Sequence, residues 1–329
     1  MKEVRFRQRN GPGGGLVKEL DEETRKSFAT GVTSEAASVG MSGAKTTADT
    51  LASTEEIEER CPARYADARP DVTYGSFVHG EYDSVTCGRK RGYMILLPAG
   101  YCRERKYPVL YLLHGIFGDE YSFPRDSENR LKEITANMAK DGLIGETIVV
   151  CPNMYASSDP QQQPGFTKEA CLPYDRFIYD LTADLMPHIE TTYSVRTGRE
   201  NTYLAGFSMG GRETIYITLK RPELFGYVCA ISAAPGIIAT KDAYMTHEGM
   251  MSGEEMRFAD GAVLPERFLI CCGTKDSVVG TYPMSYHKLL EKNGAAHIWY
   301  EIPEADHDNG AIRSGIYNLF KQIAGSEKN

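Results

Sequence analysis

The segment YLAGFSMGGRETIYITLK, residues 203–220, contains the most informative pattern in this sequence. Its Gly-x-Ser-x-Gly motif, residues 206–210, follows a short apolar run expected to be a strand, 203–205, and precedes an expected helix, 212–220. A serine on such a tight strand-to-helix turn has its Oγ lifted clear of the sheet, and the glycines leave room for the turn. We therefore predict that Ser208 is a nucleophile. The alternative is a Gly-rich helix start with a buried, hydrogen-bonded serine.

Strand-like and helix-like segments alternate on both sides of this motif. Apolar residues recur at helical spacing over 177–189 and 316–323. The expected strands are 93–97, 109–113, 147–150, 203–205, 227–231, 268–272 and 298–300. This alternation predicts an α/β fold with a mostly parallel central sheet and helices on both faces. In such a sheet the ligand site lies beyond the carboxyl ends of the strands, so catalytic residues are expected there.

A nucleophilic serine requires a base and an acid that orients the base, and both are expected on loops that follow strands. His307 follows the last expected strand and precedes the last helix, which makes it the best candidate for the base among the seven histidines. Asp276 lies four residues beyond the expected strand 268–272, where its carboxylate can orient the imidazole. Asp306 and Asp308 flank the histidine and are the alternatives for the acid.

Acyl transfer also requires N–H donors for the oxyanion that forms. The amide of Met209, directly after the nucleophile, is one candidate. The other is expected from the loop LHGIFG, residues 113–118, whose glycines allow amides to turn inward. We expect the amide of Ile116 to fill this role, with Gly115 next. His114 is expected to be a structural hydrogen-bonding residue rather than a catalyst.

Two long segments are candidates for the walls of a substrate pocket. Residues 236–265 are too long for a bare loop, and are expected to form a small cap over an apolar acyl group or, alternatively, a surface helical insertion. This segment carries Met245, Met250, Met251 and Met256. It also holds His247, a weaker alternative for the base. Residues 153–174 are expected to form the opposite wall. The candidate substrate-binding residues are Gly115, Phe117, Tyr155 and Tyr174, the tyrosines by stacking on a ring or a sugar.

Composition and charge exclude several other classes of protein. The 329 residues are 41% hydrophobic and 25% charged, which is typical of a globular protein. The net charge of −8 argues against a nucleic-acid partner, since phosphate binding favours a basic face. The eight cysteines include no Cys-x-x-Cys pair, so we expect buried free thiols and no metal site. No organic cofactor is expected either.

Residues 1–70 differ from the rest of the chain, being rich first in glycine and then in small polar residues. We expect a flexible or loosely helical extension there, and an α/β catalytic domain over 71–329. No apolar stretch follows the charged first residues, so we expect no secretory signal there, and the sequence has no apolar run of about 18 residues or more. We therefore expect no membrane partner and a cytoplasmic location, or secretion if this sequence is part of a larger secreted enzyme.

Residues from about 75 to 323 resemble the putative-esterase family of α/β hydrolases, which includes esterase D-like enzymes and carbohydrate esterase family 1. The resemblance is carried by YPVLYLLHG (107–115), GFSMGG (206–211), GTKD (273–276) and HD (307–308). It implies an α/β-hydrolase fold in which Ser208, Asp276 and His307 are the nucleophile, acid and base.

Within that family the sequence is most similar to the feruloyl-esterase branch, which cleaves hydroxycinnamate esters from xylan side chains. That branch has Gly-His-Asp-Trp around its base, whereas residues 306–309 read DHDN. The resemblance implies a serine esterase whose partner is a small-molecule or oligosaccharide ester, feruloyl or acetyl. The alternatives are an acyltransferase, a siderophore or S-formylglutathione-type esterase, and a catalytically silent carbohydrate-binding relative.

Overall fold

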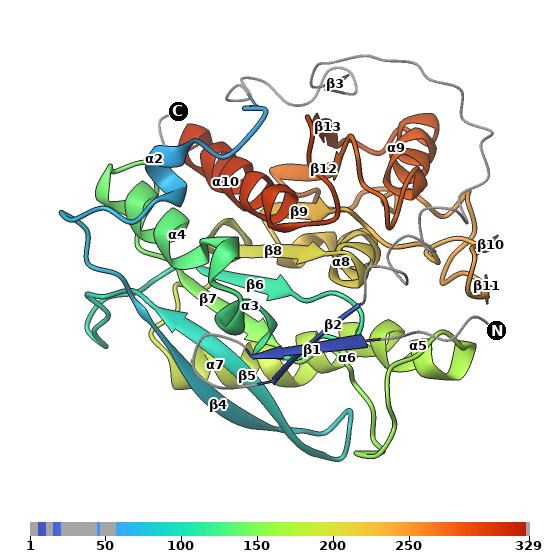
Figure 1. Ribbon diagram of the computed structural model, residues 1–329, viewed down its shortest axis with the longest axis horizontal. Coiled ribbons are helices and arrows are strands. Elements are labelled where there is room, and N and C mark those ends of the chain that lie inside the picture. Colours follow the sequence, from blue (N-terminus) through green and yellow to red (C-terminus); the bar gives the residue numbers. More distant parts are fainter. Residues whose placement is uncertain (1–5, 11–15, 21–44, 47–56, 327–329) are drawn as a thin grey trace.

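The computed structural model describes residues 6–10, 16–20, 45–46 and 57–326. These residues form an α/β fold around a nine-stranded sheet with the order β3-β13-β12-β9-β8-β6-β7-β5-β4 (Figure 1). Its strands are β3 (Lys45–Thr46), β4 (Ser76–Ser84), β5 (Arg89–Leu97), β6 (Val109–Leu113), β7 (Ile148–Pro152), β8 (Thr202–Phe207), β9 (Tyr227–Ile231), β12 (Arg267–Gly273) and β13 (Ile298–Ile302). Neighbouring strands from β13 to β7 pair in parallel, whereas β5, β4 and β3 pair antiparallel. The predicted fold class is confirmed.

The helices cover both faces of the sheet. They are α2 (Ala63–Ala66), α3 (Ser122–Arg125), α4 (Leu131–Lys140), α5 (Lys168–Asp175), α6 (Phe177–Tyr179), α7 (Met186–Thr192), α8 (Met209–Lys220), α9 (Tyr282–Lys292) and α10 (Asn309–Ser326). Short 3-10 turns are η1 (Ser127–Asn129), η3 (Arg199–Asn201) and η4 (Pro222–Leu224), and η2 (Asp180–Leu185) is a π-helical segment between α6 and α7.

Each central strand contributes alternate side chains to two separate cores. In β6, Leu110 and Leu112 pack with residues of α4 and α10, whereas Val109, Tyr111 and Leu113 pack with residues of α6 to α9. Because both faces are covered, strands such as β6 and β9 are buried along their whole length. This explains why they appear in the sequence as unbroken apolar runs.

Strand β4 and the helix over 177–189 differ from the sequence expectations. β4 was not predicted, because as an edge strand it is largely exposed and has no apolar run. The expected single helix contains the π-helical segment η2, whose first residue is the buried Asp180. Its carboxylate accepts hydrogen bonds from the hydroxyls of Tyr82 and Ser84 on β4 and lies 3.0 Å from Nε of Arg91 on β5. The edge strands are therefore tied to this helix by a buried charge.

The expected extension over residues 1–70 falls largely outside the described residues. Among the described ones, β1 (Phe6–Asn10) pairs antiparallel with β2 (Leu16–Leu20), and β3 pairs with β13. Residues 57–70 pack on the catalytic domain, since Tyr65 is buried and the Glu58 carboxylate binds Tyr317 and Lys321 of α10. The expected boundary at residue 70 was therefore too late, because a short polar segment can be ordered by long-range contacts.

The insertion over 236–265 contains only a short hairpin, β10 (Thr240–Lys241) with β11 (Thr246–His247), and no helix among its described residues. The expectation of a surface helical insertion was therefore wrong. Met256 is fully buried in the core, and Met251 is nearly so. These two methionines consequently anchor the segment rather than line a pocket.

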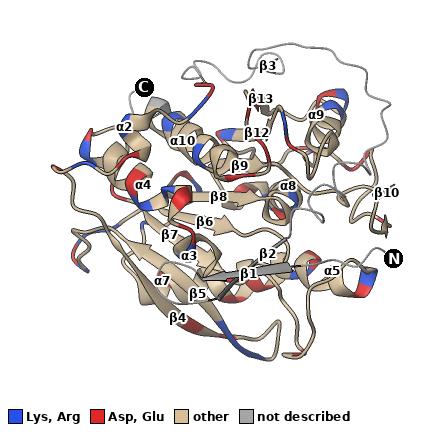
Figure 2. Cartoon of the chain, in the orientation of Figure 1, with Lys and Arg blue, Asp and Glu red and all other residues tan. Residues whose placement is uncertain are grey.

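Acidic and basic residues are interspersed along the elements of the chain (Figure 2). All eight cysteines lie within the described ranges as free thiols, and only Cys61 and Cys102 are partly exposed. In the described ranges, no helix is long and apolar enough to cross a membrane.

Candidate active site

The nucleophile candidate Ser208 lies on the turn between β8 and α8, as the motif predicts. Its φ of 60° and ψ of −116° put a non-glycine residue in a strained conformation, which is the feature expected of a nucleophile turn. The turn is possible because the flanking glycines have no side chain. A Cβ at Gly206 would overlap the carbonyl of Gly210, and a Cβ at Gly210 would overlap the carbonyl of Leu113.

His307 and Asp276 meet at the carboxyl end of the sheet, on the loops after β13 and β12. Nδ1 of His307 lies 2.9 Å from Oδ2 of Asp276. Oδ1 of Asp276 accepts hydrogen bonds from the amides of Val278 and Val279, at 3.1 and 2.9 Å. Burial would raise the pKa of Asp276, but the neighbouring His307 and the Val279 amide outweigh it and lower the pKa to about 2. The carboxylate is therefore ionised and can orient the imidazole.

The imidazole of His307 also lies beside the nucleophile turn. Its ring centroid is 4.4 Å from that of Phe207, the residue immediately before Ser208. Because Nδ1 is directed to Asp276, Nε2 is the nitrogen that remains for the serine proton. The structure thus pairs His307 with Asp276 and places its ring beside the residue that precedes Ser208, and the triad of these three residues stays a prediction.

The alternative acids Asp306 and Asp308 have other partners. The carboxylate of Asp306 binds the amide and hydroxyl of Ser277, and that of Asp308 accepts from the amides of Gly310 and Ala311 at the start of α10. The alternative base His247 is buried in β11 and pairs with Asp242 at 2.9 Å. These contacts favour Asp276 and His307 over the alternatives as the candidate acid and base.

The loop over residues 113–118 passes directly beside the nucleophile. A Cβ built on Gly115 would lie 3.3 Å from Cβ of Ser208. The Phe117 amide donates to the hydroxyl of Tyr174 at 3.2 Å, and the Gly118 amide donates to the carbonyl of Gly115 at 3.1 Å. In the described part of the chain the Ile116 amide has no such acceptor, so it can serve an incoming oxyanion.

Met209 supplies the second candidate donor. It is the first residue of α8, and the first amides of a helix have no acceptor within the helix. The positive end of α8 adds to its effect. The pairing of Met209 and Ile116 as an oxyanion hole is compatible with this geometry and stays a prediction.

His114 links the oxyanion loop to the segment that follows β7. Its Nε2 accepts a hydrogen bond from the amide of Met154 at 3.0 Å, so the proton is on Nδ1, which donates to the carbonyl of Gly115 at 2.7 Å. Burial lowers the pKa of His114 to about 4, so the ring is neutral at pH 7. This is the structural role that the sequence predicted.

Two of the predicted substrate-binding residues are interior residues instead. Tyr174 is 0% exposed and Tyr155 only 7% exposed, and their rings pack edge to face at 4.9 Å. The Tyr155 hydroxyl donates to the carbonyl of Gln163, and the Tyr174 hydroxyl accepts from Phe117. Both therefore support the walls of the site, and the prediction that they stack on substrate was wrong. Phe117 and Gly115 are partly exposed, as substrate-binding residues should be.

A row of partly buried aromatic rings runs away from the oxyanion loop. Phe117 contacts Phe166 edge to face at 5.3 Å, and Phe166 stacks on Tyr244 at 4.7 Å. These rings come from three different loops. The sequence analysis missed Phe166 and Tyr244, although both lie in the segments it assigned to the pocket walls. It also missed Cys272, whose thiol lies 3.6 Å from Oδ2 of Asp276.

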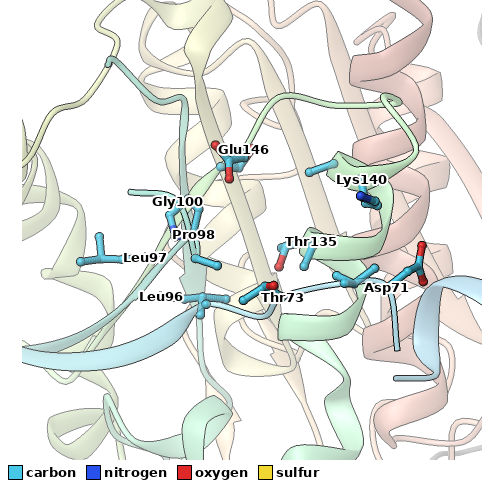
Figure 3. Close-up of a pocket in the computed structure, with 15 residues that line it drawn as sticks. Asp71, Thr73, Leu96, Leu97, Pro98, Gly100, Thr135, Lys140 and Glu146 are labelled. Carbon is cyan, nitrogen blue, oxygen red and sulfur yellow. The ribbon is translucent and has the colours of Figure 1, made fainter. Parts of the chain in front are cut away.

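A separate pocket of about 450 Å³ lies at the opposite end of the sheet (Figure 3). It is lined by the segment before β4, the end of β5 and α4, with Asp71, Lys140 and Glu146 as its charged residues. None of the three catalytic candidates is in it. Its position, at the amino ends of the parallel strands, is the end where catalytic residues are not expected.

Comparisons with known proteins agree with this geometry. The model of a family described as putative esterase matches residues 84–285. A CE1 ferulic acid esterase from Anaeromyces mucronatus, whose structure was solved in complex with ferulic acid, is 40% identical to this chain with a TM-score of 0.78. The match covers 83% of this chain and 99% of the chain of that esterase. The chain belongs to this esterase family. It is a carboxylic ester hydrolase.

Two further proteins are similar to this chain at lower sequence identity. An endo-1,4-beta-xylanase/feruloyl esterase from Xylanibacter ruminicola is 32% identical over 164 residues, which is 48% of this chain but only 22% of that protein. The chain thus spans less than a quarter of that curated relative. An S-formylglutathione hydrolase from Agrobacterium tumefaciens is 18% identical, with a TM-score of 0.59, and covers 76% of this chain and 95% of that chain. At this identity it shares the fold alone.

Proposed function

We propose that the esterase hydrolyses hydroxycinnamate esters, such as feruloyl esters, that are carried on plant carbohydrate. The observation that carries this proposal is the 40% identity to a ferulic acid esterase whose structure was solved with ferulic acid bound. The match covers 99% of that esterase's chain. The Xylanibacter relative, which joins a xylanase to a feruloyl esterase, supports the carbohydrate part of the substrate. The likeness to S-formylglutathione hydrolase gives no comparable support for a thioester substrate, because it reflects the fold only.

The site supports a two-step acyl-enzyme mechanism. Ser208 Oγ attacks the ester carbonyl while Nε2 of His307 accepts its proton, and Asp276 stabilises the imidazolium through Nδ1. The amides of Met209 and Ile116 bind the oxyanion. His307 then gives the proton to the departing sugar alcohol, which leaves the feruloyl group on the serine. Water, deprotonated by His307, attacks that acyl-enzyme, and His307 returns the proton to Ser208 Oγ as the acyl–oxygen bond breaks and ferulate leaves.

The aromatic row gives a physical reason for an aromatic acyl group. Phe117 follows Ile116 directly, so the row of Phe117, Phe166 and Tyr244 begins next to the proposed oxyanion donor. A planar phenolic ring can pack against such rings by stacking or edge-to-face contact, and each such pair contributes about 0.5–1.5 kcal/mol. An acetyl group is too small to use this surface. We therefore assign the row to the acyl side of the substrate.

The first test compares hydrolysis of methyl ferulate and 4-nitrophenyl acetate by the wild type and by Ser208→Ala. We expect the wild type to hydrolyse both esters and the variant to hydrolyse neither, while retaining the same thermal unfolding midpoint within a few degrees. Turnover of the acetate alone would overturn the hydroxycinnamate proposal. No turnover of either ester by folded wild type would overturn the esterase mechanism itself.

The second test addresses the acyl site. Phe166→Ala and Tyr244→Ala should each raise KM for methyl ferulate about three- to tenfold, the factor that corresponds to one lost aromatic pair. KM for 4-nitrophenyl acetate should change less than about twofold, because its acyl group does not reach the row. Tyr179→Ala is the matched control, since this tyrosine is 61% exposed on α6 and outside the row. Equal effects on both esters would contradict the assignment.

A further inference from the structure

Asp306, directly before the base, has an unusually complete set of hydrogen bonds. Its Oδ1 accepts from the Ser277 amide at 2.7 Å, the Ser277 hydroxyl at 2.8 Å and the His307 amide at 2.8 Å. Its Oδ2 lies 3.1 Å from the same hydroxyl. One carboxylate thus contacts the residue after the catalytic acid and the backbone of the catalytic base.

The other contacts between the acid loop and the base loop lie before Asp276. Two of them use side chains, since the Glu304 amide donates to Oγ1 of Thr274 at 2.9 Å and Nζ of Lys275 pairs with the Glu304 carboxylate. The amides of Thr274 and Lys275 donate to the carbonyls of Ile302 and Ala305, each at 3.0 Å. Gly273 allows this approach, because a Cβ there would overlap the Ala305 carbonyl. These backbone bonds end at Lys275, immediately before Asp276. The next link, on the other side of Asp276, is the contact between Ser277 and Asp306.

We propose that Asp306 is a positioning residue that holds the acid loop and the base loop together and so maintains the distance between Nδ1 of His307 and Oδ2 of Asp276. The catalytic acid is tied on both sides, by Lys275 to Ala305 and by Ser277 to Asp306. Without Asp306, the described contacts between the two loops all lie before Asp276, apart from the bond between Asp276 and His307. The segment that follows Asp276 can then move away from the base loop. This inference rests on the catalytic roles proposed above. Asp306 is the first residue of the segment DHDN, residues 306–309, that contains the base.

Asp308 provides a matched comparison on the other side of the same histidine. It carries the same charge at the same separation along the chain, but its carboxylate accepts from the amides of Gly310 and Ala311. It thereby caps α10 and has no described contact with the acid loop. Replacing Asp308 therefore removes a charge and a helix cap beside His307 while leaving the tie between the loops intact.

The experiment measures kcat and KM for 4-nitrophenyl acetate with Asp306→Ala, Asp306→Asn and Asp308→Ala. A displacement of about 1 Å between catalytic groups costs on the order of 100-fold in rate, so we expect Asp306→Ala to lower kcat about 10- to 100-fold with KM within about twofold. Asp306→Asn retains an acceptor for the amides of Ser277 and His307, and should recover kcat to within about fivefold of wild type. Asp308→Ala should lower the unfolding midpoint but keep kcat within about threefold.

A second readout separates this inference from the proposed function. The rate of labelling by a fluorophosphonate probe reports activation of Ser208 without requiring any particular ester. Labelled wild type and unlabelled Ser208→Ala would establish the activated serine, and Asp306→Ala should then label at least about tenfold more slowly than Asp308→Ala. If the Asp306 and Asp308 variants label and turn over alike, Asp306 has no positioning role. If folded wild type fails to label, the serine mechanism fails instead.

Discussion

The hydroxyl of Tyr174 on α5 accepts a hydrogen bond of 3.2 Å from the backbone amide of Phe117 in the oxyanion loop. Phe117 has a φ of 63°, which is a left-handed conformation that a phenylalanine rarely adopts. Such a conformation persists only where neighbouring contacts enforce it. The buried tyrosine provides one of these contacts, so the shape of the oxyanion loop depends on a residue far from it in the sequence.

Tyr174→Phe tests this dependence. The change removes only the acceptor for the Phe117 amide, and we expect kcat to fall about three- to tenfold with little change in KM, since the Ile116 amide is placed less accurately. Leaving the amide without a partner should also cost about 1–3 kcal/mol of unfolding free energy. Tyr155→Phe is the control, because its hydroxyl binds Gln163 instead of the loop. A kcat loss of the same size in both variants would contradict a specific role for Tyr174.

His114 gives a prediction about stability in mild acid. Burial lowers its pKa to about 4, below the value near 6.5 that it has in an unfolded chain. As the pH falls, the unfolded state therefore takes up the proton first. The stabilisation of the folded state by neutral His114 is thus complete above about pH 6.5 and is lost as the pH falls towards 4. Its size is on the order of 3 kcal/mol. Urea unfolding between about pH 7 and 4 should show a steeper loss for wild type than for His114→Ala.

The control for that experiment is Val78→Ala on the edge strand β4, which shortens an exposed side chain that has no titratable group. We expect the stability of this variant to follow the pH in parallel with wild type. If the curve of His114→Ala also runs parallel to wild type, the histidine is not buried in its neutral form, and the bridge between Met154 and Gly115 is not present in solution.

Asp276 should contribute to the stability of the folded state in a lower pH range than His114. Its pKa is lowered to about 2, so it stabilises the fold above about pH 4, and this contribution disappears as the pH falls towards 2. The contribution is roughly 2 kcal/mol, since the group is almost fully buried against His307. Asp276→Asn should flatten the stability curve between about pH 4 and 2, and should lower kcat by about 1,000- to 10,000-fold at neutral pH because the imidazole loses its orienting anion. A kcat within tenfold of wild type would move the acid role elsewhere.

The sequence allowed most of the sheet to be predicted, and the candidate catalytic residues to be selected, because their signals are local. The nucleophile turn is contained within residues 203–220, and Asp276 and His307 each lie on the loop that follows an apolar strand. Buried parallel strands are unbroken apolar runs, which explains why their positions were found. β4 was missed because an exposed edge strand has no such run.

The residues that the sequence did not reveal depend on contacts between distant segments. Tyr174 is 57 positions from Phe117, and no local pattern shows that its ring is interior rather than open to substrate. Asp306 and Ser277 are separated by 29 positions, so Asp306 could be considered only as a rival acid. Phe166 and Tyr244 become neighbours only when the segment before α5 meets the insertion. Side-chain burial and pairing of this kind follow from the tertiary fold.

Gly210 offers a test of the nucleophile turn itself. A Cβ at this position would overlap the carbonyls of Leu113 and His114, so the first turn of α8 could not lie as close to the end of β6. We expect Gly210→Ala to destabilise the fold by about 1–3 kcal/mol, or more, and to reduce kcat at least about 100-fold, because Ser208 and its oxyanion donors shift together. Gly253→Ala is the control, since its Cβ would meet only Leu289 at an ordinary 3.7 Å. Thermal unfolding and 4-nitrophenyl acetate turnover, measured for both variants, test this prediction. An active, stable Gly210→Ala would mean that helix and strand are not packed so closely, and the steric reason for the motif would fail.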